Sequence, residues 1–180
     1  MRSRPSRTVA PMTTAPRAER PAMAEYGVPD DLDGVLPWSW AEERLLASRN
    51  LWVVTASAAG RPHAMPVWGV WLPESSTCVF SCAPSSRKAR NLAENPQATV
   101  AVDHTVEVVT VEGSTRLVTP DEASVALDAY VAKYYEDEAA WDGAKEFLAQ
   151  NLIVELAPER AFGIIEDEVD FSQRATKWVW

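Results

Sequence analysis

The chain has 180 residues, of which 47% are hydrophobic and 24% are charged, and its net charge is −9. This composition is typical of one globular domain with some additional chain. The negative charge argues against nucleic-acid binding, because phosphate backbones select a basic surface. No apolar run of about 18 residues is present that would indicate a membrane span.

Residues 1–22 have the composition of a disordered tail, with five Arg, one Glu and four Pro and no hydrophobic period. We interpret them as a flexible extension, or as an upstream start with Met23 as the real beginning. An Arg-rich start can resemble a transit peptide, but this one lacks an amphipathic face. The folded domain is therefore expected to cover residues 23–180.

A helix is predicted over residues 37–50, with Ser39 as its N-cap and Glu42 completing a capping box. Apolar, β-branched runs bounded by turn residues then predict five strands, at 51–57, 63–71, 77–82, 97–103 and 106–119. One or two helices follow within residues 119–151, and three further strands are predicted at 152–158, 161–167 and 174–180. Pro66 indicates an edge or a bulge in its strand. Short turns between successive strands favour antiparallel pairing and a closed or nearly closed barrel.

Two cysteines, Cys78 and Cys82, occur in the sequence CVFSC. On a strand they share a face but lie too far apart to form a disulfide. The chain has only two histidines to add to them, so we expect no metal site. Both thiols are interpreted as small core residues of a cytoplasmic protein.

The segment APSSRKARNLAENP places Arg87, Lys88 and Arg90 in the first turns of a predicted helix, with Ser85 or Ser86 as its cap. The N-terminus of a helix carries partial positive charge, so cations there are unfavourable unless something offsets them. Free backbone N–H groups, a hydroxyl and cations at one point are typical of a phosphate site.

The alternative is a solvated charged face, and it suits Arg90, because Glu94 lies one turn further on. Arg87 and Lys88 have no acid at the equivalent spacing. The pattern therefore favours an anion from outside the chain at these two residues.

These segments, in this order, resemble the pyridoxamine 5'-phosphate oxidase-like split β-barrel flavoproteins. Within that family the chain is most similar to the flavin/deazaflavin oxidoreductase branch, which uses coenzyme F420. The likeness covers residues 38–180. Its most specific motifs are GRPHAMPVW and, at family spacing, S-x-K-x-x-N-L, here Ser86, Lys88, Asn91 and Leu92.

The resemblance implies a mainly β (α+β) fold, an antiparallel six-stranded split β-barrel with flanking helices. It also implies an obligate homodimer with a cofactor in each groove between the subunits. The implied cofactor-binding residues are Met65, Pro66, Val67, Trp68, Ser81, Ser86, Arg87, Lys88, Asn91, Lys177 and Trp178. Lys177 and Trp178 would reach the other subunit's cofactor, although the family more often carries Arg where this chain has Lys177.

The implied function is that of an oxidoreductase that uses F420 to transfer a hydride to a small unsaturated organic acceptor. FMN is the alternative cofactor, and a non-catalytic flavin- or haem-binding protein is the alternative outside enzymes, with His63 or His104 as a haem ligand. A flat ring attached to a phosphate requires an apolar slot and an anion clamp. Because the redox chemistry belongs to the cofactor, no protein acid or base is assigned. Arg61 would extend the positive path toward the longer anionic tail of F420.

Overall fold

The computed structural model describes residues 15–180, so residues 1–14 of the expected tail lie outside it. Five α-helices and two short 3-10 helices lie in this part of the chain: η1 (Ala24–Tyr26), α1 (Trp38–Ala47), α2 (Arg87–Glu94), α3 (Ser124–Tyr134), η2 (Glu138–Ala140), α4 (Trp141–Ala149) and α5 (Asp170–Arg174). Its strands are β1 (Arg17–Glu19), β2 (Leu51–Ala56), β3 (Pro62–Val67), β4 (Gly69–Leu72), β5 (Thr77–Cys82), β6 (Gln97–Val102), β7 (Glu107–Val118), β8 (Leu152–Ile165) and β9 (Thr176–Val179).

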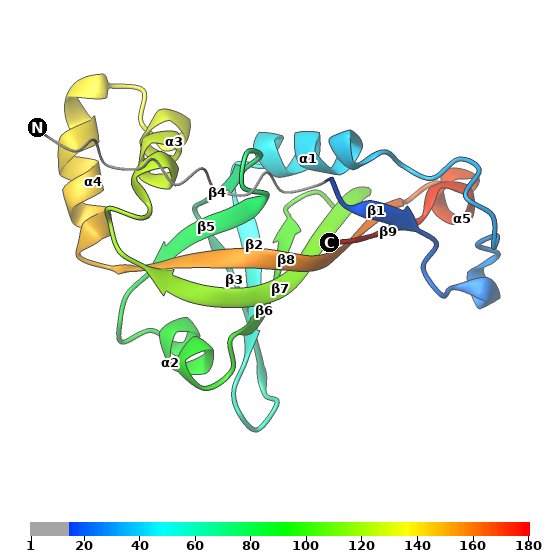
Figure 1. Cartoon of the computed structure of the whole chain (residues 1–180), viewed down its shortest axis with the longest axis horizontal. Helices are drawn as coiled ribbons and strands as arrows, with labels where there is room; N and C mark the ends of the chain where they lie inside the picture. Colours follow the sequence, from blue (N-terminus) through cyan, green and yellow to red (C-terminus); the bar gives the residue numbers. More distant parts are fainter. Residues whose placement is uncertain (1–14) are drawn as a thin grey trace, which may run out of the picture.

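The strands form one antiparallel sheet in the order β1-β9-β8-β7-β6-β2-β3, and β5 joins β8 to β4. The fold is therefore mainly β, with helices at its flanks (Figure 1). β3 and β4 follow one another along the chain but are not paired with each other, so the hydrogen-bonded path does not close into a ring. The antiparallel prediction is confirmed, whereas the six-stranded barrel and the homodimer are not.

Two strand predictions differ from the structure. The strand expected at 63–71 is divided at Trp68 into β3 and β4. The two strands expected at 152–158 and 161–167 are instead one strand of 14 residues, β8. The register of β7 with β8 shifts where Glu112 pairs with Arg160 and Gly113 with Pro158, so β8 carries one extra residue beside Pro158, which has no N–H to donate.

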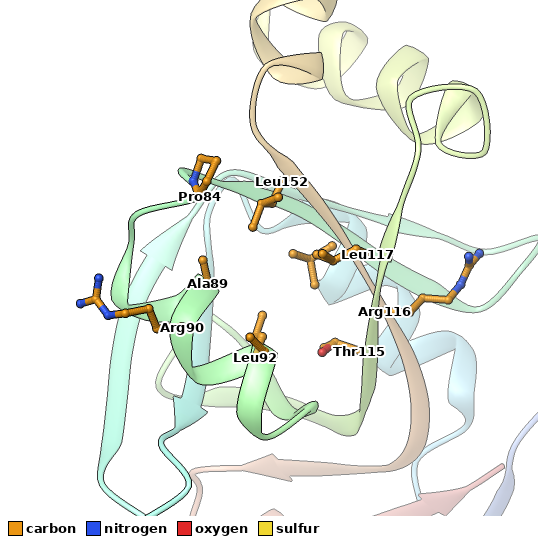
Figure 2. Close-up of a pocket in the computed structure, with 10 residues that line it drawn as sticks. Pro84, Ala89, Arg90, Leu92, Thr115, Arg116, Leu117 and Leu152 are labelled. Atoms are coloured by element: carbon orange, nitrogen blue, oxygen red, sulfur yellow. The ribbon is translucent and has the colours of Figure 1, made fainter.

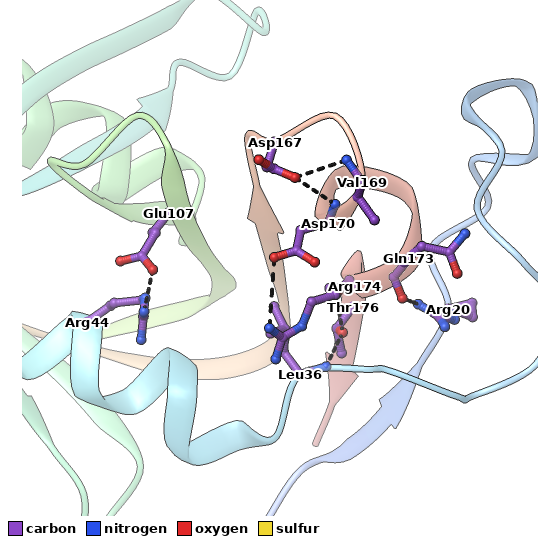
Figure 3. A network of polar contacts seen from close by, with 10 residues as sticks. All are labelled: Arg20, Leu36, Arg44, Glu107, Asp167, Val169, Asp170, Gln173, Arg174 and Thr176. Carbon is purple, nitrogen blue, oxygen red and sulfur yellow. Dashed lines mark hydrogen bonds and ion pairs between the residues drawn. The ribbon is translucent and has the colours of Figure 1, made fainter.

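The sheet begins within the segment expected to be a disordered tail. β1 pairs with β9, opposite Lys177, Trp178 and Val179. Arg20 then donates hydrogen bonds of 2.7–3.0 Å to the backbone carbonyls of Asp31, Gln173 and Ala175. Figure 3 shows Arg20 reaching Gln173 on the segment that leads to β9. These contacts tie the N-terminal strand to the C-terminal one across more than 150 residues of sequence.

The main core lies between the inner faces of the strands and α1, with Leu45, Val53, Val100 and Val111 fully buried. Helix α1 begins after Pro37 and has no side-chain cap, so the predicted cap at Ser39 is wrong. The Glu42 carboxylate instead accepts a hydrogen bond from the Trp71 indole N–H at 3.0 Å. Tertiary contact has replaced the local capping box.

A second, smaller core lies where α3 and α4 cover the ends of β4, β5 and β8 (Figure 1). Val70, Val79 and Ile153 meet Tyr130 and Tyr134 of α3 there. Both cysteines are buried and free, as predicted. None of the helices within residues 15–180 has the length and apolar character needed to cross a bilayer.

Candidate functional site

The candidate site lies where strands β3 and β5 diverge from each other. Gly69 of β4 pairs with Phe80 of β5, and this pairing ends there. β5 continues through Ser81 to Cys82 paired only with β8, while β3 is paired only with β2. Within residues 15–180, the second edge of β3 therefore has no partner strand. Its backbone N–H and C=O groups are free to bind a flat ligand in the way they would bind another strand.

Helix α2 follows β5 directly and is anchored beside this divergence. Ser86 caps it, accepting a hydrogen bond from the Ala89 N–H at 3.2 Å, which confirms the predicted cap. The buried side chain of Asn91 donates a hydrogen bond to the Thr55 hydroxyl of β2 at 2.9 Å. Asn91 therefore holds the helix against β2, the strand next to β3.

The two cations of the predicted anion site lie in the first turn of α2. Arg87 is exposed and Lys88 is half-buried. No ion pair joins either of them to a carboxylate within the described part of the chain. Arg90 donates to the Ser85 carbonyl at 2.6 Å instead of pairing with Glu94 as expected. The charge at Arg87 and Lys88 is therefore not neutralised by the described residues.

His63 connects these cations to β3. It lies opposite Thr55 in the strand pair, and its Nδ1 atom is buried without a hydrogen-bond partner among the described residues. Burial lowers the pKa of His63, and the positive charges of Arg87 and Lys88 lower it further. The imidazole is thus within electrostatic range of both cations. A buried nitrogen without a partner is a place where a ligand can complete the hydrogen bonding.

The predicted ring-contact residues lie along the free edge of β3 and just beyond it. Met65 and Trp68 are 45% and 42% exposed, and Pro66 is also exposed. Val67 is buried opposite Leu51, so its backbone, not its side chain, is available at the edge. Ser81 is half-buried at the end of β5, across the divergence.

The C-terminal pair does not join this cluster. Trp178 is fully buried in the core of its own chain, with its ring 5.4 Å from that of Trp38. The Trp178 indole is thus enclosed by its own fold, and its contact with a partner's cofactor stays a prediction. Lys177 is paired with Glu19 of β1 at 2.5 Å. Only the pairing of β1 with β9 reveals this neutralisation.

The sequence also did not reveal an apolar cavity of about 290 Å³ beside α2. Figure 2 shows it between α2 and strands β7 and β8, with Ala89 and Leu92 on one side and Leu117 and Leu152 on the other. Its one hydroxyl, on Thr115, is bonded to the Pro96 carbonyl.

Comparison with known proteins agrees with this arrangement. Residues 40–164 match the family model of pyridoxamine 5'-phosphate oxidase. The chain belongs to this family. The matched range contains the β3 edge, the α2 cations and the α3–α4 pair. A search of curated proteins finds no match.

Solved structures share the family fold at low sequence identity. A conserved hypothetical protein from Mycobacterium tuberculosis has a TM-score of 0.65 and 16% identity, over 76% of this chain and 89% of that one. The haem storage protein HutZ from Vibrio cholerae has a TM-score of 0.56 and 21% identity, over 72% and 95%. An F420 reductase has a TM-score of 0.52 and 20% identity, over 67% of this chain and 94% of its own.

Proposed function

We propose that this protein is an oxidoreductase that uses coenzyme F420 to transfer a hydride to a small unsaturated organic acceptor. The observation that carries the proposal is the pair of cations at the start of α2, Arg87 and Lys88. They have no carboxylate partner among the described residues and act electrostatically on His63 of the free strand edge. A phosphate attached to a flat ring would suit both the cations and the strand edge. The phosphate would neutralise the cations, and the ring would lie along the free edge of β3.

The residues present fit such a cofactor. The N–H groups of the first turn of α2, with Arg87 and Lys88, would hold the phosphate. The β3 edge from Met65 to Val67, with Trp68 directly after it, would bind the ring. The ring would also supply the hydrogen-bond partner that the buried His63 Nδ1 atom lacks. When bound, F420 supplies the hydride. The chain itself binds, orients and shields the reacting face from water.

F420 is preferred over FMN because its tail carries further anionic groups beyond the phosphate. Arg61 is exposed in the turn before β3, and it is the cation that we expect to meet this tail. The F420 reductase among the structural neighbours supports this choice at the level of the fold. FMN remains the second candidate, since the ring and phosphate sites suit both cofactors.

We expect two copies of the chain to enclose the cofactor, each contributing a six-stranded split barrel. The outer face of β2 and β3 leaves Trp52 43% exposed opposite Pro66, which is a large apolar side chain to leave in water. The two free, buried thiols suit a reducing cytoplasm.

Haem binding without catalysis is the competing function, and two observations favour it. HutZ and a haem-binding protein from Mycobacterium smegmatis are among the structural neighbours. Burial and the positive charges of Arg87 and Lys88 lower the pKa of His63, which favours the neutral imidazole that a haem ligand requires. His104 is less suited, because its Nδ1 accepts a hydrogen bond from the Glu107 N–H at 2.8 Å.

The test is a set of titrations of the purified protein with F420, FMN and haemin, followed by absorbance. We expect the tightest binding for F420, and about tenfold weaker binding in Lys88→Ala, the effect of losing one charge-assisted contact of about 1.4 kcal/mol. Arg160→Ala removes a surface cation that is paired with Glu112, and it serves as the matched control. Equal affinities of Lys88→Ala and wild type for both flavins would show that the phosphate site is wrongly placed.

A further inference from the structure

A hollow of about 390 Å³ is lined in part by Tyr134, which stacks on Trp68 and accepts a hydrogen bond from Gly69, the two residues at the junction of β3 and β4. It lies between the start of β2 and the end of α3, and its lining includes Arg49, Lys133, Tyr134 and Tyr135. The Arg49 guanidinium is 5.9 Å from the centre of the Trp68 ring and 5.7 Å from that of Tyr134. The hollow therefore lies beside the exposed indole of Trp68, which directly follows β3, the strand proposed to contact the cofactor ring.

The Trp68 indole is held in a fixed orientation. It stacks on Tyr134 with the ring centres 4.6 Å apart and the planes 2° from parallel. The Tyr134 hydroxyl donates to the Arg49 carbonyl at 2.5 Å and accepts from the Gly69 N–H at 2.9 Å. Trp68 nevertheless stays 42% exposed, so aromatic surface remains open beside the ring strand. A rigid, partly exposed aromatic surface is a stacking platform for a flat ligand.

Two cations, Arg49 and Lys133, and two acids, Glu136 and Asp137, line the hollow, and no ion pair joins them. Neither Arg49 nor Lys133 forms an ion pair with a carboxylate within residues 15–180. Lys133 is committed to the Gly69 carbonyl at 3.0 Å, whereas the Arg49 side chain is exposed. Asp137 caps the 3-10 helix by accepting a hydrogen bond from the Ala139 N–H, and the Glu136 carboxylate is exposed to solvent. Arg49 is therefore the group available to an anionic ligand.

We propose that this hollow binds the acceptor, and that the acceptor is a flat conjugated molecule carrying a carboxylate. Its conjugated part stacks on Trp68, next to the β3 edge, and its carboxylate pairs with the Arg49 guanidinium. The assignment rests on the proposed function, because it is the cofactor along β3 that makes the neighbouring hollow an acceptor site. Trp68 and Arg49 then select the acceptor by shape and by charge respectively.

The test uses 2-naphthoate and its neutral analogue 2-naphthamide, titrated by calorimetry into the full-length chain with and without bound cofactor. Wild type is expected to bind the carboxylate about tenfold more tightly than the amide, a difference of about 1.4 kcal/mol. Arg49→Gln should abolish this preference while leaving amide binding within about twofold. Trp68→Leu should weaken both probes by about tenfold, because it removes the stacking surface. Arg174→Gln, on α5 at the other end of the molecule, is the matched control (Figure 1).

The inference is overturned if wild type does not discriminate between the two probes, if it binds neither at millimolar concentration, or if Arg49→Gln keeps the preference. Failure of the proposed function has a different signature. In that case neither F420 nor FMN binds wild type in the cofactor titrations. The preference for naphthoate over naphthamide is measured separately, on the chain without cofactor, so the two failures can be told apart.

Discussion

The hydrogen bond between Asn91 and Thr55 carries a prediction about how α2 is held beside β3. Thr55→Val keeps the shape and the β-branch of the side chain but removes the hydroxyl that accepts from Asn91 at 2.9 Å. Thr55 is 2% exposed and Asn91 is 5% exposed, so water cannot replace the lost partner. The variant therefore leaves a buried amide without an acceptor.

The expected cost follows from that burial. Leaving a buried polar group unsatisfied costs about 1–3 kcal/mol, whereas removing both partners is nearly neutral. For a domain of this length we expect the melting temperature to fall by about 2–4 °C for each kcal/mol. The measurement is the free energy of unfolding from urea titration, together with the FMN and F420 affinities. Affinity should fall beyond the loss of folded protein, because α2 presents both predicted phosphate contacts.

Thr99→Val is the matched control, since Thr99 is half-buried on the adjacent β6 and none of the side-chain hydrogen bonds of the described residues involves it. Adding Asn91→Leu to Thr55→Val should recover part of the lost stability. Equal unfolding free energies for Thr55→Val and Thr99→Val would refute the anchoring role of this bond.

Three further predictions concern packing and charge. In Gly163→Ala the new Cβ would lie 2.5 Å from the Trp178 ring, so we expect a loss of about 1–3 kcal/mol in urea titration, and an unchanged stability would contradict the packing of Trp178. Hydrogen bonds from the Thr119 backbone and the Arg116 side chain lower the pKa of Glu122 from 4.5 to about 2. The stabilisation that Glu122 contributes is therefore complete above pH 4.5 and is lost as the pH falls toward a pKa of about 2. Glu122→Gln should therefore lose less stability than wild type over that acid range, and parallel curves would count against the shift. Burial and the α2 cations lower the pKa of His63. Lys88→Ala, or the binding of FMN to wild type, should therefore raise this pKa in an NMR titration. A pKa that stays constant would show that the phosphate binds elsewhere.

Local pattern was sufficient for much of the sheet and for the start of α2. β-Branched, apolar runs between turn residues located most of the strands, because alternation and turn chemistry act over a few residues. Ser86 caps α2 as predicted because an N-cap is a contact over three residues. The same local logic was wrong at Ser39, where tertiary packing gave Glu42 a different partner in Trp71.

By itself, the sequence determined most of the segments that become strands, the cap of α2 and the uncompensated pair Arg87 and Lys88. All of these depend on residues that are close to one another in the chain. Only the tertiary structure decided that Trp178 is enclosed in its own core and that Trp68 stacks on Tyr134. Such contacts join residues far apart in the chain, and their partners are set by sheet topology, which no local periodicity encodes.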